Sequence, residues 1–411
     1  MLKRTIDFLS SLKLTVALLA LGIALVFFGT LGQVNDGLYL AQQKYFRSWF
    51  TYWHPAQLAW LIVPLPGGYF LGTSLLVNLI TAHISRFRFG WKKSGIWMTH
   101  FGIILLLIGQ LATDMFATES HMRLVEGRPK SYSDSSQKNE LAITILGDKT
   151  NDTVVAFPEA LVAQKGELKN DALPFRIRII DYFANSAAQP RGPRSGGQAQ
   201  ADHGLAQFFT FAPAPESFSM DDRNMPGTVV EIVGTKGPIG TWVAPLYAGD
   251  DGAAAFLSHR LVEQLGPQLG QRMGQELSQP QEFELDGKRY RIAFRPVRLY
   301  MAHSLELVKF THEKYLGTDI PKDFRSRVRL RNPQSTEDRE LDIYMNNPLR
   351  YAGLTYYQSS FDQFDPRVTV LQVVKNPSWL TPYAGCALVA AGLLVQFLIH
   401  LVGFITKRRT A

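Results

Sequence analysis

Hydrophobic residues in this chain are concentrated in four segments that contain no Asp, Glu, Lys or Arg. They lie at residues 14–31, 68–84, 96–113 and 381–404. A hydrocarbon core about 30 Å thick requires about 20 helical residues, so we predict four transmembrane helices at these positions. Pro64, Pro66 and Gly67 precede the second segment and break a helix. We therefore expect a short piece at the membrane interface there, followed by the span.

A long polar stretch, residues 114–377, separates the third and fourth segments and has a different pattern. Short alternating or β-rich runs dominate it, such as "LAITIL", "FRIRIIDYF", "FELDGKRYRIAF" and "RVTVLQVV", and Asp286-Gly287 between two runs is typical of a hairpin turn. We predict an antiparallel β-rich domain, sandwich-like, inserted between the third and fourth transmembrane helices. One amphipathic helix is expected near 253–277, and the Gly- and Pro-rich segment 185–204 is expected to be a mobile loop.

The distribution of charge predicts the orientation of the spans. Residues 1–13, 83–95 and 405–411 hold ten of the 43 basic residues and only one acid, Asp7. The positive-inside rule therefore places both termini and the 83–95 loop in the cytoplasm, and the β-rich domain outside. The predicted organisation is a membrane region at 1–113, the extracytoplasmic domain at 114–377, and a last span with a basic tail at 378–411. Further spans follow the first one, so it is not expected to be a cleaved signal peptide.

The remaining composition excludes several classes of protein. Outside those three flanks the basic and acidic residues nearly balance, so the net charge of +8 gives no support to nucleic-acid binding. Cys386 is the only cysteine and lies in the last span, so no disulfide is expected in the domain and the chain is no thiol–disulfide carrier. Without C-x-x-C-H it is not itself a c-type cytochrome.

The extracytoplasmic domain carries no recognisable catalytic motif. It has no nucleophile elbow, zinc pattern or paired carboxylates, and its histidines are scattered without metal-ligand spacing. We expect these histidines to be surface or packing residues: His121, His203, His259, His303 and His312. His121 is the most interesting of them, because it lies just outside the third span. An enzyme confined to this domain is unsupported.

The third span contains an ionisable residue, His100. Small residues at helical spacing (Gly95, Thr99, Gly102, Gly109, Thr113) form a stripe suited to close helix packing, and His100 points about 140° away from it. His100 is thus expected to face lipid or a second protein. Two interpretations are open: an interfacial histidine that reaches toward the head groups, or a neutral imidazole that binds haem iron.

Other residues around this span fit the haem interpretation. Trp97 could lie against the macrocycle, and a second axial ligand could be His83 or come from another chain. Four cations could meet the haem propionates, although the positive-inside rule alone also accounts for them: Arg86, Arg88, Lys92 and Lys93. His54 and His400 also lie near the ends of spans.

Several stretches resemble the ResB (CcsB) family of cytochrome c biogenesis proteins. They are "LSSLKLTVALLALGIALVFFGTLGQ", "GGYFLGTSLLVNLITAHISRFR" with Asn78 in the span, "MTHFGIILLLIGQ", and "MNNPLRYAGLTYYQSSFDQFDPRVTVLQVVKNPSWL" before the last span. The last of these is the most specific. The resemblance covers nearly the whole chain and includes the order of four spans with a large domain between the third and fourth.

This resemblance implies a function in System II cytochrome c maturation. Such a protein works with a CcsA (ResC) membrane partner to carry haem b, as a transient cargo, across the membrane and join it to C-x-x-C-H of apocytochrome c. The family's transmembrane histidine corresponds to His100, which makes it the expected iron ligand. The implied location is the bacterial inner membrane, multi-pass, with the large domain in the periplasm. The chain would then be a non-catalytic or co-catalytic subunit of a haem lyase complex.

The sequence departs from the fused form of this family, because it has no Trp-rich "WGxxWxWD"-like segment. The partner is therefore implied and not visible. The alternative from another class is a haem-free, membrane-anchored β domain that acts as a scaffold or sensor in the assembly of extracytoplasmic proteins. An electron-transfer cytochrome b is less well supported, because it would need two or more facing histidine pairs inside spans, whereas only His100 lies clearly inside one.

Overall fold

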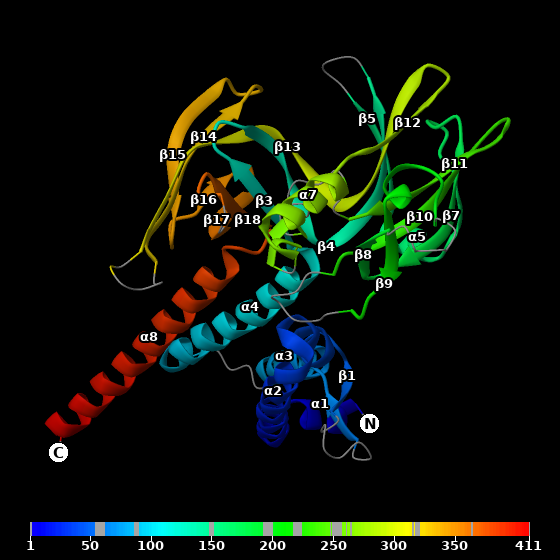
Figure 1. The fold of residues 1–411 in the computed structure, drawn as a ribbon. Helices are drawn as coiled ribbons and strands as arrows, with labels where there is room; N and C mark the ends of the chain where they lie inside the picture. The colour runs from blue at the N-terminus through cyan, green and yellow to red at the C-terminus, as the bar shows by residue number, and fades with distance from the viewer. Residues whose placement is uncertain are drawn as a thin grey trace. The chain divides into compact units, whose positions relative to one another are not determined.

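The computed structural model describes residues 2–53, 62–85, 90–147, 152–191, 200–216, 224–246, 248, 257–259, 261–263, 265–314, 316, 321–362 and 365–410. The chain divides into two compact units, which are described separately (Figure 1). The first contains Met1–Thr118 and Lys375–Ala411, and the second contains Glu119–Ser217 and Asn224–Val374.

The first unit is mainly helical. Its α-helices are α1 (Leu2–Leu9), α2 (Leu12–Ala41), α3 (Gly68–Ser85), α4 (Ser94–Phe116) and α8 (Thr381–Thr410). Within the described chain, three helical stretches are long and apolar enough to cross a membrane: Leu12–Val34, Trp91–Phe116 and Thr381–Arg408. The first, third and fourth predicted spans fall inside them. α3 begins directly after the proline-rich segment, as expected, and has 18 residues.

The described part of the connection from α2 to α3 is a helical turn followed by a short β-ribbon, and residues 54–61, which include most of the expected interfacial piece, lie outside the described chain. A single π-helical turn, η1 (Gln42–Phe46), follows α2, and β1 (Phe50–Trp53) then pairs antiparallel with β2 (Val63–Pro66). The prolines at 64 and 66 therefore lie in a two-stranded ribbon, where each strand has a free edge that tolerates a missing N–H. His54 lies outside the described residues.

α4 and α8 pack as an antiparallel pair along the predicted stripe of small residues. A Cβ atom added to Gly102 would lie 2.6 Å from Val389 and 2.8 Å from the carbonyl oxygen of Gly385. Gly95 contacts Gly392 in the same way, and Gly109 contacts Thr381. At the three glycines of the stripe, the two helices approach too closely for any side chain.

A buried amide joins α3 to the break between α1 and α2. Asn78 is 3% exposed. Its Nδ2 donates to the carbonyl oxygens of Leu9 (2.6 Å) and Ser11 (3.2 Å), and its Oδ1 accepts from Thr15 Oγ1 at 2.7 Å. The carbonyl of Leu9 is the last of α1, whereas that of Ser11 also accepts from the backbone N–H of Thr15 at 3.3 Å. The asparagine thus fixes how the first two helices meet the third.

The second unit is β-rich and antiparallel, as predicted. Its strands are β3 (Thr118–Val125), β4 (Pro129–Leu146), β5 (Thr153–Pro158), β6 (Gly166–Leu168), β7 (Arg176–Phe183), β8 (Ser186–Pro190), β9 (Phe209–Pro213), β10 (Gly227–Gly234), β11 (Gly237–Pro245), β12 (Gln281–Leu285), β13 (Lys288–Lys314), β14 (Pro321–Asn332), β15 (Glu337–Tyr344), β16 (Leu349–Tyr351), β17 (Leu354–Phe361) and β18 (Val368–Lys375). The short helices are α5 (Glu159–Ala163), η3 (Gly204–Gln207) and α7 (Pro267–Leu277).

This unit contains two hydrophobic cores, whereas the sequence predicts one sandwich. In the first core, β12-β13-β4-β5 face the sheet β11-β10-β7-β6, with Ile143, Phe294 and Ile177 inside. In the second, the sheet β15-β14-β13-β4-β3-β18-β17-β16 curls until β14 and β15 contact β17. β4 and β13 have 18 and 27 residues. Because an ordinary strand has about 5–6 residues, each of these is long enough to pass through both cores (Figure 1).

Smaller sequence predictions had different outcomes. Asp286 and Gly287 form the turn between β12 and β13 with φ of 51° and 72°, as the hairpin prediction requires. Of the helix expected near 253–277, residues 257–259, 261–263 and 265 are helical and α7 begins at Pro267, while residues 251–256, 260 and 264 lie outside the described chain. The expected loop 185–204 contains a strand, β8, and its residues 192–199 are also outside.

Candidate functional site

The structure brings together three of the residues singled out from the sequence. His83 lies in the last turn of α3, and Trp97 and His100 lie in the first two turns of the antiparallel α4. The ring centres of His83 and His100 are 4.6 Å apart, and those of His83 and Trp97 are 5.0 Å apart in an edge-on contact. His100 does face away from the α4–α8 contact, but the residue it meets is His83 of its own chain. The expectation that it faces only lipid or a second protein was wrong.

Both histidines are held in the same way. Nδ1 of His83 lies 2.9 Å from the carbonyl oxygen of Leu79, and Nδ1 of His100 lies 2.9 Å from that of Ile96. A carbonyl only accepts hydrogen bonds, so each Nδ1 carries the proton and donates it. Neither Nε2 has a hydrogen-bond partner in the part of the chain that is described. Each Nε2 therefore presents a lone pair, the arrangement found in metal-binding histidines.

These rings line a cavity of about 660 Å³ between α2, α3 and α4. Its wall is mostly aliphatic, with Trp97 and both histidines toward one end and Lys93 beside them. A volume of this size is typical of sites for organic ligands, which occupy about 300–1,000 Å³. Of the four predicted cations, Lys93 lines the cavity, and Arg86 and Arg88 lie outside the described residues.

The spacing of the two histidines limits how a metal could bind. A histidine nitrogen lies about 2 Å from its metal ion, so two rings on opposite sides of one iron have centres about 6 Å apart. The observed 4.6 Å is too short for a porphyrin between them. The cavity residues fit haem bound through one imidazole, or through both after the rings separate by about 2 Å.

His400, another histidine near a span end, has a different environment. Its Nε2 lies 2.9 Å from Gln396 Nε2 on α8, and Gln396 Oε1 accepts from the backbone N–H of Ile96 at 3.3 Å. Gln396 thus satisfies one of the free N–H groups at the start of α4. His400 supports the α4–α8 contact and does not line the cavity.

Comparison with known proteins agrees with the resemblance seen in the sequence. Residues 274–367 match the model of the ResB-like family. Over 328 residues the chain is 32% identical to Protein NrfI of Wolinella succinogenes, an alignment that covers 79% of this chain and 29% of NrfI. The chain therefore contains a ResB-like region at residues 274–367. It spans less than a third of the length of NrfI.

The segment that matches the ResB-like model lies in the second unit and reaches from α7 to the start of β18. It contains a buried histidine, His303, which is 3% exposed and lies 2.6 Å from the hydroxyl of the fully buried Tyr356. In the neighbouring positions of β17, Tyr356 is in the core while Tyr357 is exposed. No group of three potential metal-binding side chains occurs among the described residues.

The sequence left open whether His83 or a residue of another chain adjoins His100. The two residues are 17 positions apart and lie on different helices, so no local spacing records their contact. The available signal was the pair of span ends, since consecutive antiparallel helices bring the end of one beside the start of the next.

Proposed function

We propose that this ResB-like protein is a haem-handling subunit of System II cytochrome c maturation. It works with a CcsA/ResC-type membrane protein to move haem across the membrane and attach it to C-x-x-C-H of apocytochrome c. The single observation that carries the proposal is the pair of free Nε2 atoms, of His83 and His100, at the wall of an apolar cavity. The match of residues 274–367 to the ResB-like family model is independent support.

Four residues that line the cavity have a proposed role in binding haem. His100 supplies the Nε2 that binds iron, and the carbonyl of Ile96 fixes the ring so that this nitrogen stays free. Trp97 presents an aromatic face to an aromatic macrocycle. Lys93 supplies a positive charge for the propionates. His83 either adds a second ligand or holds His100 in place before haem arrives.

The proposed topology has four spans, with both termini in the cytoplasm and the β-rich unit in the periplasm of a bacterial inner membrane. α3 is proposed as the second span in chain order, because its 18 residues extend about 27 Å and it contacts α1, α2 and α4. The basic flanks support this orientation. Lys93, at the cytoplasmic end of α4, then places the histidine pair in the inner half of the membrane.

The test is the absorbance of the chain purified together with its partner, which should show a b-type haem spectrum. His100→Ala should remove or strongly reduce the bound haem, because it removes the proposed iron ligand and leaves the imidazole of His83 alone at the cavity wall. His400→Ala is the matched control, since it removes a membrane histidine that does not line the cavity, and it should keep the haem.

Unchanged haem content in the His100→Ala variant would contradict the site. If cytochrome c maturation also proceeds in that variant, while deletion of external strands abolishes it, the haem-free scaffold becomes the better description.

A further inference from the structure

A second cavity of about 540 Å³ lies at the other end of α3 and α4. It is lined by the end of α2, by η1, and by the first turns of α3 and the last turns of α4. Leu107 lines both this cavity and the one that contains the histidines. From His100 to Asp114 the helix advances 14 residues, or about 21 Å, and Leu107 lies midway. The two cavities thus follow one another along the same pair of helices.

The far end of the second cavity carries a cation held in a fixed position. Asp114 accepts hydrogen bonds from the hydroxyl of Tyr69 and forms an ion pair with Arg47, whose Nε lies 2.7 Å from Oδ1. Asp114 is 12% exposed, whereas Arg47 is 40% exposed. The 2.7 Å contact joins Asp114 to the Nε of Arg47, and the guanidinium of Arg47 also lines the cavity. Its two outer nitrogens can therefore bind a carboxylate while Asp114 orients the guanidinium.

The body of the cavity is open and amphipathic. Gly72 is part of its wall, and a Cβ atom added there would meet nothing within 4 Å, so the space in front of α3 is empty of protein atoms. Leu76 and Leu111 contribute apolar surface, while Gln42 and Gln110 contribute amide groups. An apolar body that has, at one end, the more exposed guanidinium of the Arg47–Asp114 pair suits an amphiphile with an acidic head.

We propose that this second cavity is an outer binding site for haem, in which Arg47 holds a propionate after the cargo passes Leu107. The inference rests on the proposed function for the identity of the cargo, but not on iron coordination. Lys93 at the first cavity and Arg47 at the second give the same acidic group a partner at each end of the path. Because Leu107 borders both cavities, its side chain is the barrier between them.

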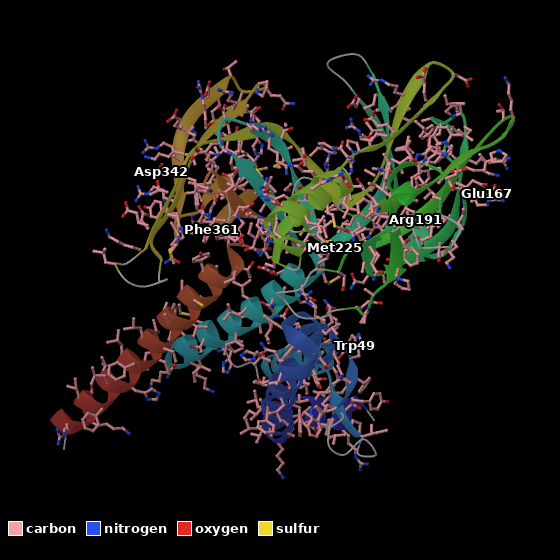
Figure 2. The ribbon with its side chains drawn as sticks, in the orientation of Figure 1. Trp49, Glu167, Arg191, Met225, Asp342 and Phe361 are labelled. Carbon is pink, nitrogen blue, oxygen red and sulfur yellow. The ribbon has the colours of Figure 1, made fainter. Side chains whose placement is uncertain are left out.

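The experiment uses metal-free protoporphyrin, which keeps both carboxylates and cannot bind a histidine through iron. Trp49, labelled in Figure 2, reports on this site, because its ring centre lies 6.4 Å from that of Tyr69. The signal is the quenching of tryptophan fluorescence by porphyrin that is present in the parent chain and absent in the Trp49→Phe variant. The full chain is titrated in phosphatidylcholine nanodiscs, and protoporphyrin dimethyl ester, which lacks free carboxylates, is titrated in parallel.

Arg47→Gln should weaken porphyrin binding about tenfold or more, because a hydrogen bond to a charged group is lost. Arg47→Lys should recover part of the affinity. Lys44→Gln is the matched control: Lys44 is also in the segment after α2, pairs with Asp36 and does not line the cavity. The Lys44→Gln variant should bind protoporphyrin with the affinity of the parent chain. The parent should bind the dimethyl ester only weakly, with an affinity similar to that of the Arg47→Gln variant for protoporphyrin.

Equal affinity of the parent and Arg47→Gln for protoporphyrin would overturn the proposal, as would equal affinity for the ester and the acid. Loss of the Trp49 signal in nanodiscs that contain phosphatidylglycerol would also overturn it, because the occupant would then be a lipid. These outcomes are separate from the proposed function, which depends on iron–haem absorbance and His100.

Discussion

Single buried or half-buried side chains in this protein illustrate two uses of histidine. His83 and His100 use Nδ1 to hold the ring and leave Nε2 free toward a cavity. His303 has the opposite arrangement, because its Nε2 is 2.6 Å from Tyr356 Oη and its ring packs edge-on against Tyr351. A histidine whose Nε2 is already bonded in a core serves folding, whereas one with a free Nε2 beside a cavity is available to a ligand.

The environment of His303 predicts a pH dependence of stability. Burial lowers the pKa of His303, although the negative charge of Glu337 opposes the shift. Below about pH 6.5 the unfolded chain therefore binds more protons than the folded chain. The stabilising contribution is complete above that pH and decreases as the pH falls toward the folded-state pKa. The melting temperature of the full chain should thus be lower at about pH 5.5 than at about pH 7.5.

His303→Gln should reduce this difference in melting temperature, because glutamine keeps a hydrogen-bonding side chain without titrating. His312→Gln, on the same strand β13, is the control and should keep the difference. An identical pH response in the parent and the His303 variant would contradict the assignment to His303.

At the scale of elements, the contact of α4 with α8 is set by glycine. Gly95, Gly102 and Gly109 recur every seven residues on α4, and Gly385 and Gly392 do so on α8. The backbones touch along this line, which fixes the rotation of α4 about its axis. Since His100 is on the opposite face, the glycine contact also directs it toward α3. The packing of one face thus positions the candidate site on the other.

Gly102→Leu should disrupt this contact. The added Cβ would lie 2.6 Å from Val389 and 2.8 Å from a backbone oxygen, so the helices must separate, at a cost of about 1–3 kcal/mol. Gly22→Leu in α2 is the control, because a Cβ at Gly22 meets nothing within 4 Å and the change should be nearly neutral. Resistance of the full chain to unfolding by SDS measures both. Equal resistance of the two variants would show that the contact does not require glycine.

At the scale of the second unit, β4 and β13 unite two cores into one body. Glu140 and Arg295 are paired across these strands at the point where the first core ends. Both side chains are buried, and Arg295 Nε lies 3.0 Å from Glu140 Oε1. The pair satisfies the charges where the strands leave the first core, so unfolding of either core is expected to be transmitted to the other.

Glu140→Gln should destabilise the protein by about 3–5 kcal/mol, because it leaves Arg295 buried without a counter-charge. The double change Glu140→Leu with Arg295→Met should recover most of the loss. Glu276→Gln breaks the exposed pair with Arg272 on α7 and should cost only about 0.3–0.5 kcal/mol. Denaturant unfolding of the full chain measures these values. A loss from Glu140→Gln as small as that from Glu276→Gln would show that the junction pair is not important.

The sequence by itself determined the features that depend on neighbours along the chain. Three apolar helices follow from unbroken hydrophobic segments, and the strands follow from alternation, because burial of one face repeats with the period of the element. The turn at Asp286 and Gly287 was also predictable, since few residues tolerate its positive φ angles. The seven-residue glycine spacing indicated a close helix contact before its partner was known.

Only the tertiary structure decided which distant residues meet. Three contacts join segments that carry no record of each other in their local pattern. They are the pairing of His83 with His100, the connection of two β cores through β4 and β13, and the sharing of Leu107 by two cavities. Periodicity reports which face of an element is buried. It does not report against which element, because any apolar face of similar shape provides nearly the same free energy of burial.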